Sequence, residues 1–289
     1  ATKYIPEIIS QVEKLIKKGY AYKIEGDGWY FDIKKFPDYG KLSRRTALQA
    51  EDAVTRIDES VKKRNKGDFC VWKFSPPAGG PDEPVWKSPF GDGRPGWHIE
   101  DTAISEKYFG PQYELHGGGM DLKFPHHEAE IAQQESASGK KPFVKLWIHT
   151  GMLTVRGEKM AKSLKNFLTI REYLEKHSPT ALRFAFFSHH YQTPVNYEES
   201  LIKDAELALY RVWSFLGALD LVKASKKQGK RRINLAPYSK KFFAALEDDI
   251  NTPMAFATVF ALINEAGQSE VIFDLSRKTI EEMKKFIVS

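Results

Sequence analysis

The feature that most constrains the fold is a change of sequence pattern near residue 198. Beyond that point, apolar residues recur at intervals of three and four, the spacing that gives an α-helix one apolar face. They are Leu201, Ala205, Ala208, Leu209, Val212, Phe215, Leu216 and Leu219. Two more helices are predicted over residues 238–249 and 253–267. Because such a helix must bury its apolar face against other elements, residues 198–289 are expected to form a helical bundle.

Ahead of residue 198 the pattern mixes short strands with helices. A helix is predicted over residues 4–18, and two β-like runs at 20–24 and 29–32 enclose a glycine turn typical of a hairpin. The other predicted elements are helices over 41–60 and 170–177, a helix from Pro179, a buried strand over 143–148, a short strand over 152–155 and an irregular loop over 73–96. This part of the chain therefore belongs to the α/β class.

Composition narrows the classes of protein. Cys70 is the single cysteine, so the chain cannot form an internal disulfide or a metal site from several of its own thiolates. A formal charge of +6 permits a polyanionic partner without demonstrating one. Apolar runs fall far short of the roughly 20 residues that cross a bilayer, so we expect a cytoplasmic protein with no membrane partner.

Five of the eight histidines lie between residues 97 and 150, and the first chemical pattern begins at one of them, His116. It is followed by three consecutive glycines, Gly117, Gly118 and Gly119. Without side chains, these residues let backbone amides approach a ligand closely, and the carboxylate of Asp121 can accept hydrogen bonds from ribose hydroxyls. The pattern suits a nucleotide, although a glycine run can also form a simple turn.

A second pattern is a possible metal pair. If Pro125 starts a helix, His126 and Glu130 stand at positions i and i+4 and share one face, as two ligands of one ion require. His127 points about 100° away from them. Two potential ligands alone do not make a metal site.

A third pattern precedes the first two in the chain. Trp97 can form one wall of a small substrate pocket, and His98 and Glu100 can set its polarity. Asp101 lies 25 residues before His126, a separation that a folded connection can close into one metal site.

The fourth pattern is the turn Lys159-Met160-Ala161-Lys162-Ser163. Two lysines three residues apart can both face triphosphate oxygens and stabilise charge on departing pyrophosphate. A lysine-rich turn by itself is usually a solvated surface feature.

Taken together and in this order, these segments resemble the class I cysteinyl-tRNA synthetases. The resemblance covers practically the whole chain, starting at the helix that follows Ala1, and rests on residues 63–65, 93–100, 116–130, 147–152, 159–163 and 248–253. It implies an incomplete Rossmann-type class I synthetase catalytic domain followed by an α-helical bundle domain. Residues 1–150 would be the second part of the catalytic domain with its inserted segment, 151–197 the lysine-loop and stem-contact region, and 198–289 a truncated tRNA-side domain.

The resemblance also implies a zinc ion that binds the thiolate of the substrate cysteine. The family's ligands are two cysteines, a histidine and a glutamate; the last two match His126 and Glu130, and the second cysteine falls on Asp101. The first cysteine, like the HIGH-type ATP motif, is expected before Ala1, so we expect this chain to be inactive alone. Asp101 replaces a soft thiolate by a harder carboxylate, which leaves open whether this chain binds zinc.

The implied reaction is the ATP-dependent activation of cysteine to cysteinyl-adenylate, with ATP and Mg²⁺ as substrate, and transfer of cysteine to tRNA(Cys). By the same resemblance, Lys162 contacts phosphate and Lys159 supports the loop, while Asp121 meets the ribose. The residues assigned to the nucleotide are Gly117, Gly118, Gly119 and Lys162, and those assigned to the substrate pocket are Trp97, His98 and His116.

Three other functions remain open on sequence grounds. One is a mycothiol-type cysteine ligase, which shares the adenylate chemistry but uses an amino sugar as acceptor. Another is a non-catalytic tRNA-binding relative. The third is a metal hydrolase built on His126, His127 and Glu130. Nothing in the sequence indicates the oligomeric state.

Overall fold

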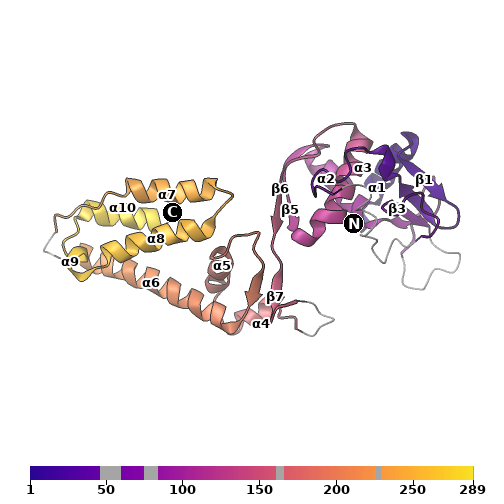
Figure 1. Ribbon diagram of the computed structural model, residues 1–289. Coiled ribbons are helices and arrows are strands. Elements are labelled where there is room, and N and C mark those ends of the chain that lie inside the picture. The colour runs from indigo at the N-terminus through magenta and orange to yellow at the C-terminus, as the bar shows by residue number, and fades with distance from the viewer. Residues whose placement is uncertain (46–59, 75–83, 161–165, 226–228, 289) are drawn as a thin grey trace. The chain divides into compact units, whose positions relative to one another are not determined.

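The structure is a computed structural model that describes residues 1–45, 60–74, 84–160, 166–225 and 229–288. It divides into two compact units, Ala1–His149 and Thr150–Ser289 (Figure 1). No helix within the described ranges is both long and apolar enough to cross a membrane.

The first unit combines a four-stranded sheet, a group of three helices and a two-stranded sheet. Its elements are α1 (Ile5–Lys17), β1 (Ala21–Ile24), β2 (Gly28–Phe31), β3 (Phe69–Phe74), β4 (Gly93–Pro95), α2 (Trp97–Phe109), β5 (Tyr113–Gly119), α3 (Glu128–Ser138) and β6 (Val144–Thr150). The larger sheet has the order β1-β2-β3-β4, with every neighbouring pair antiparallel. β5 and β6 are hydrogen-bonded neighbours, and α3 lies between them in the chain.

The predicted helix 4–18 and the hairpin after it are confirmed by α1 and by the antiparallel pair β1–β2. Local sequence determines both elements. α1 buries four apolar residues on one face, Ile5, Ile8, Val12 and Leu15. This face joins the core of the unit, which includes Phe31 and Phe69 of the sheet and Ile99 of α2. The three helices α1, α2 and α3 contact one another, and α2 also contacts β3.

α3 differs from an ordinary core helix. Ten of its eleven residues are buried, and half of these ten carry carboxylate or amide side chains: Glu128, Glu130, Gln133, Gln134 and Glu135. Because buried polar groups must find partners, this helix fixes the position of several neighbouring segments.

The second unit begins with a small sheet and continues into helices. Its elements are β7 (Leu153–Val155), β8 (Glu158–Lys159), α4 (Ile170–Leu174), α5 (Pro179–Phe187), β9 (Val195–Tyr197), α6 (Glu199–Ala224), α7 (Ala236–Glu247), α8 (Thr252–Ala266), α9 (Ser269–Ile272) and α10 (Arg277–Val288). The sheet order is β8-β7-β9, with β7 antiparallel to β8 and parallel to β9.

The starts of α4, α5 and α8 lie within one residue of the positions that the sequence predicts. Thr169 forms a capping box with Glu172 at the start of α4, and the side chain of Ser178 caps α5. The side chain of Asn251 accepts a hydrogen bond from the amide of Met254 at the start of α8. The long helix after residue 198 is α6, and its apolar residues join two clusters, one with α5 and one with the helices that follow.

Three predictions in the first unit need correction. Residues 41–44 form turns rather than a helix, because the amides of Gly40 and Ser43 donate to the buried carboxylate of Glu128; most of the predicted helix, 46–59, lies outside the described residues. The supposed loop 73–96 contains β4, which approaches β3 so closely that a Cβ at Gly93 would lie 2.1 Å from the Lys73 carbonyl oxygen. The strand over 143–148, predicted as buried, corresponds to β6 and is partly exposed, since Leu146 is 58% exposed.

Candidate metal and substrate site

Three predicted ligands come together at the start of α3. The Nε2 atom of His126 lies 3.0 Å from Oδ2 of Asp101 and 2.9 Å from Oε1 of Glu130. Asp101 comes from the second turn of α2, and the other two residues lie at i and i+4 across the start of α3, as the sequence predicts. The three donor atoms all lie within 4.8 Å of one another.

The carboxylate of Glu130 shows that this group fits a cation. Its side chain is 1% exposed, and both of its oxygens are buried without a hydrogen-bond partner. Although Oε1 lies near His126, the ring nitrogen is aligned for a hydrogen bond to Asp101 instead. Zinc held tetrahedrally at about 2.0–2.2 Å keeps neighbouring donors roughly 3.4 Å apart, close to the separations seen here.

The charges around the trio Asp101, His126 and Glu130 also favour a bound cation. Burial raises the pKa of Glu130, and its attraction to His126 only partly offsets this. Burial alone would lower the pKa of His126, but the hydrogen bond to Asp101 and the attraction of the Glu130 and Asp101 carboxylates raise it to about 9. In the metal-free protein the imidazolium ring therefore supplies the positive charge that two facing carboxylates require, and a divalent cation would displace its Nε2 proton.

Aromatic rings line one side of the three ligands. Trp97 begins α2, and its ring centroid lies 4.3 Å from that of His126. Trp97 is 48% exposed, and so is the side chain of Asp101, whereas His126 and Glu130 are buried. His98 is 2% exposed, and its Nδ1 atom lies 2.6 Å from Nδ1 of His126. The group is therefore open to solvent beside Trp97 and Asp101 and closed behind them.

A second set of rings lies on the other side of Glu130. Nε2 of His116 is 3.7 Å from Glu130 Oε2, and Nδ1 of His116 is 2.5 Å from the hydroxyl oxygen of Tyr113. Burial lowers the pKa of His116 and raises that of Tyr113 to about 12, so the hydroxyl donates to a neutral ring. Nδ1 of His127 lies 2.8 Å from Nε2 of His149. Within the described part of the chain, the donor atoms of His116, His127 and Glu130 form a second group that lies within 4.8 Å of one another.

The partner residues on β5 and β6 were not predicted from the sequence. Tyr113 begins β5, and Trp147 and His149 lie two apart on β6, where alternation places them on one face. The ring of Trp147 lies 4.8 Å from that of His116 and 5.0 Å from that of His127. The concentration of histidines between residues 97 and 150 was the signal that could have identified this cluster.

The predicted nucleotide residues lie at the end of β5. A Cβ atom at Gly118 would lie 2.7 Å from Cε1 of His127, so the absent side chain leaves room for that ring. Gly117 and Gly119 are the neighbouring strand residues, and Asp121 follows, exposed, in a short 3₁₀ turn over Met120–Leu122.

The structure does not test the lysine turn. The backbone of Lys159 belongs to β8 of the second unit, but its side chain is not described, and Lys162 lies outside the described residues.

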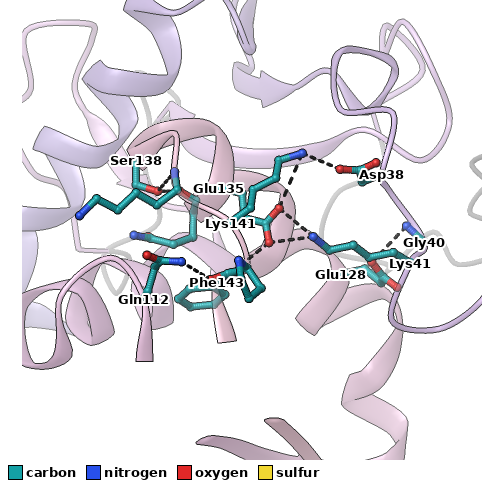
Figure 2. Close-up of polar contacts among 12 residues, drawn as sticks. Asp38, Gly40, Lys41, Gln112, Glu128, Glu135, Ser138, Lys141 and Phe143 are labelled. Carbon is teal, nitrogen blue, oxygen red and sulfur yellow. Dashed lines mark hydrogen bonds and ion pairs between the residues drawn. The ribbon is translucent and has the colours of Figure 1, made fainter. Parts of the chain in front are cut away.

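Figure 2 shows how the far part of α3 is anchored. The carboxylate of Glu135 accepts two hydrogen bonds of 2.7 Å from Nζ of Lys41 and one of 3.0 Å from the amide of Phe143. Lys141 approaches the same carboxylate to 4.0 Å and binds Asp38 at 2.5 Å. These contacts join α3 to the segment around residue 40 and to the chain entering β6.

Comparisons with known proteins assign both parts of the chain. Residues 1–207 match the family model described as the tRNA synthetases class I (C) catalytic domain, and residues 241–288 match the DALR domain. The LeuRS–tRNA–LeuAMS ternary complex of Agrobacterium radiobacter shares the fold, with a TM-score of 0.52 at 18% identity, over 68% of this chain and 30% of that chain.

Proteins named cysteine–tRNA ligase are similar along nearly the whole chain. The one from Coxiella burnetii is 44% identical over 93% of this chain and 56% of its own length. Those from Geobacter sulfurreducens and Thermoplasma volcanium are 41% and 42% identical over 99% of this chain and 60% of theirs. The chain thus spans 55–60% of the length of the curated relatives it matches. With its catalytic-domain match covering residues 1–207 of 289, the chain belongs to the class I tRNA synthetases of the (C) type.

Proposed function

We propose that this chain is the cysteine-selecting part of a cysteine–tRNA ligase, which activates cysteine with ATP and transfers it to tRNA(Cys). The observation that carries the proposal is the trio Asp101, His126 and Glu130, in which both Glu130 oxygens are buried without a hydrogen bond. Burying a carboxylate without a hydrogen bond costs free energy of folding. In a chain 41–45% identical to proteins named cysteine–tRNA ligase, substrate recognition accounts for this cost.

Asp101, His126 and Glu130 would hold a zinc ion. When bound, zinc would supply a soft cation that favours the substrate thiolate over the hydroxyl of serine. Asp101 is half-exposed, so its carboxylate can adjust to an ion without disturbing the core. Glu130 cannot move in this way because it is enclosed on the buried side of α3.

The other predicted residues form the surroundings of the substrate. Trp97 offers a flat apolar wall beside His126. His116 receives a hydrogen bond from Tyr113 at Nδ1, so the neutral ring carries its proton on Nε2 and can donate that proton in a hydrogen bond inside the pocket. Both residues orient cysteine without taking part in bond formation.

The nucleotide would lie along the end of β5. Backbone amides of Gly117, Gly118 and Gly119 would approach ATP, and Asp121 would accept hydrogen bonds from the ribose. Lys162, supported by Lys159, would contact the triphosphate with its Mg²⁺ and stabilise the leaving pyrophosphate. Positioning and charge stabilisation of this kind suffice for attack by the cysteine carboxylate on the α-phosphate.

The test is an assay of cysteine-dependent ATP–pyrophosphate exchange and of tRNA(Cys) charging by the complete protein encoded by the gene. Glu130→Gln should abolish exchange with cysteine. Glu135→Gln alters another buried carboxylate of the same helix, outside the trio, and should retain exchange when assayed below its unfolding temperature. Equal activation of serine and cysteine, or loss of exchange in both variants while both stay folded, would contradict the proposal.

A further inference from the structure

His98, which the resemblance assigns to the substrate pocket, has a buried position that this role does not explain. Its side chain is 2% exposed and lies behind His126, with 2.6 Å between the two Nδ1 atoms. At that distance the two nitrogens share one proton, which belongs to one ring and is accepted by the other. Whether His126 or His98 carries this proton decides which nitrogen of His126 can bind a metal ion.

The surroundings of His126 determine the assignment. Its Nε2 atom faces the two carboxylates, 3.0 Å from Asp101 and 2.9 Å from Glu130, so Nε2 is the atom able to ligate an ion together with them. A ligating Nε2 atom must be unprotonated, and the neutral ring then carries its proton on Nδ1. His98 Nδ1 must consequently be the acceptor.

A buried hydrogen-bond chain holds His98 in this place. The Nε2 amide of Gln133, on α3, donates to the carbonyl oxygen of His98 at 2.5 Å and to Oγ1 of Thr102 at 2.7 Å. The Thr102 hydroxyl donates to Oε1 of Gln11 on α1 at 2.7 Å, and the Gln11 amide donates to Gln134 at 2.5 Å. These four side chains are at most 1% exposed. Because every shift of one helix would break buried hydrogen bonds, the chain fixes α2, and with it His98, relative to the start of α3.

Aromatic contacts fix the plane of the ring as well. Phe69 packs edge-on against His98, with 5.3 Å between the ring centroids. The ring of Trp97 stacks on that of His98, with 5.6 Å between the centroids, and lies tilted against that of His126 at 4.3 Å. His98 is therefore restrained through both its backbone and its ring.

We infer that His98 is a positioning residue of the proposed metal site: it accepts the Nδ1 proton of His126 and so keeps the Nε2 lone pair of His126 directed at the ion. The inference rests on the proposed function, because it needs an ion at Asp101, His126 and Glu130. Partners of this kind orient ligating histidines, and their loss typically costs about 10- to 100-fold in metal affinity.

The experiment compares wild type with three variants by zinc competition against a chromophoric chelator. His98→Phe keeps the ring volume but has no acceptor, and should weaken zinc binding about 10- to 100-fold. His98→Asn retains an acceptor oxygen at the δ position and should restore most of the affinity. Glu135→Gln is the matched control, since it alters a buried carboxylate of α3 that belongs neither to the metal ligands nor to the hydrogen-bond chain that holds His98, and it should bind zinc like wild type.

A second readout separates orientation from general damage to the fold. In the zinc-loaded protein, the Nδ1 proton of His126 should give a downfield, slowly exchanging NMR resonance in wild type and in His98→Asn, but not in His98→Phe. Unchanged affinity and resonance in His98→Phe would overturn the inference while leaving the metal site intact. An equal loss in Glu135→Gln would also overturn it, because the effect would then be structural. A wild-type protein that binds no zinc would overturn the proposed site and the inference together.

Discussion

The buried carboxylate of Glu128 gives a stability prediction that the structure makes quantitative. Its side chain is fully buried and accepts a hydrogen bond from the amide of Gly40 at 3.1 Å (Figure 2). It accepts a second one from the amide of Ser43 at 2.5 Å. In Glu128→Gln one oxygen can still accept, but the new NH₂ group faces the second amide. The loss of one charge-assisted hydrogen bond, at about 1.5–3 kcal/mol, and a buried unpaired donor, at about 1–3 kcal/mol, are partly offset by easier burial of a neutral group. We expect a net loss of about 2–4 kcal/mol in the free energy of unfolding of the first unit.

Urea unfolding followed by tryptophan fluorescence measures this loss, because five of the six tryptophans lie in the first unit. The control is Glu114→Gln, which removes a surface ion pair of 3.0 Å with Lys145, where the side chain of Glu114 is 80% exposed. It should change the free energy of unfolding by less than about 0.5 kcal/mol. If Glu128→Gln were as mild as this control, the proposed anchoring of the segment around residue 40 would be wrong.

Two further predictions concern the second unit. At Gly151 an added Cβ would lie 2.3 Å from the carbonyl oxygen of Thr193, so Gly151→Ala should lower the unfolding free energy by about 1–3 kcal/mol in urea titrations followed by circular dichroism; an unchanged midpoint would refute the close approach. The hydrogen bond from Tyr238 to the Glu265 carboxylate raises the pKa of Tyr238 to about 12. Because this pKa is above its ordinary value near 10, the contribution is present below about pH 10 and lost as the pH rises through 12. Tyr238→Phe should therefore flatten the alkaline decline of stability between about pH 10 and 12, and a decline identical to that of wild type would contradict the assignment.

The sequence predicted the elements that local chemistry determines. The helix over residues 4–18 has a continuous apolar face, and Thr169, Ser178 and Asn251 are cap residues whose side chains bond the first turn in each case. The pairing of His126 with Glu130 also follows from helical spacing alone, although the ion itself is a proposal.

Features that depend on distant residues were not predictable. The turns after Gly40 form because Glu128, 88 residues later, accepts their amides, and no local pattern reveals that partner. The same holds for the contact of His98 with His126 and for that of His127 with His149, which need α2, α3 and β6 in place. Long-range satisfaction of buried polar groups, rather than propensity, decided these positions.

The most direct test of the account is the zinc content of the purified chain, measured by elemental analysis beside that of Glu130→Gln. Glu130 is the enclosed ligand whose two oxygens lack a hydrogen bond, and glutamine keeps its volume while removing the charge. The account predicts about one zinc per chain in wild type and its loss in the variant. A wild-type chain without zinc, or equal zinc in both proteins, would contradict the claim that Asp101, His126 and Glu130 form a metal site.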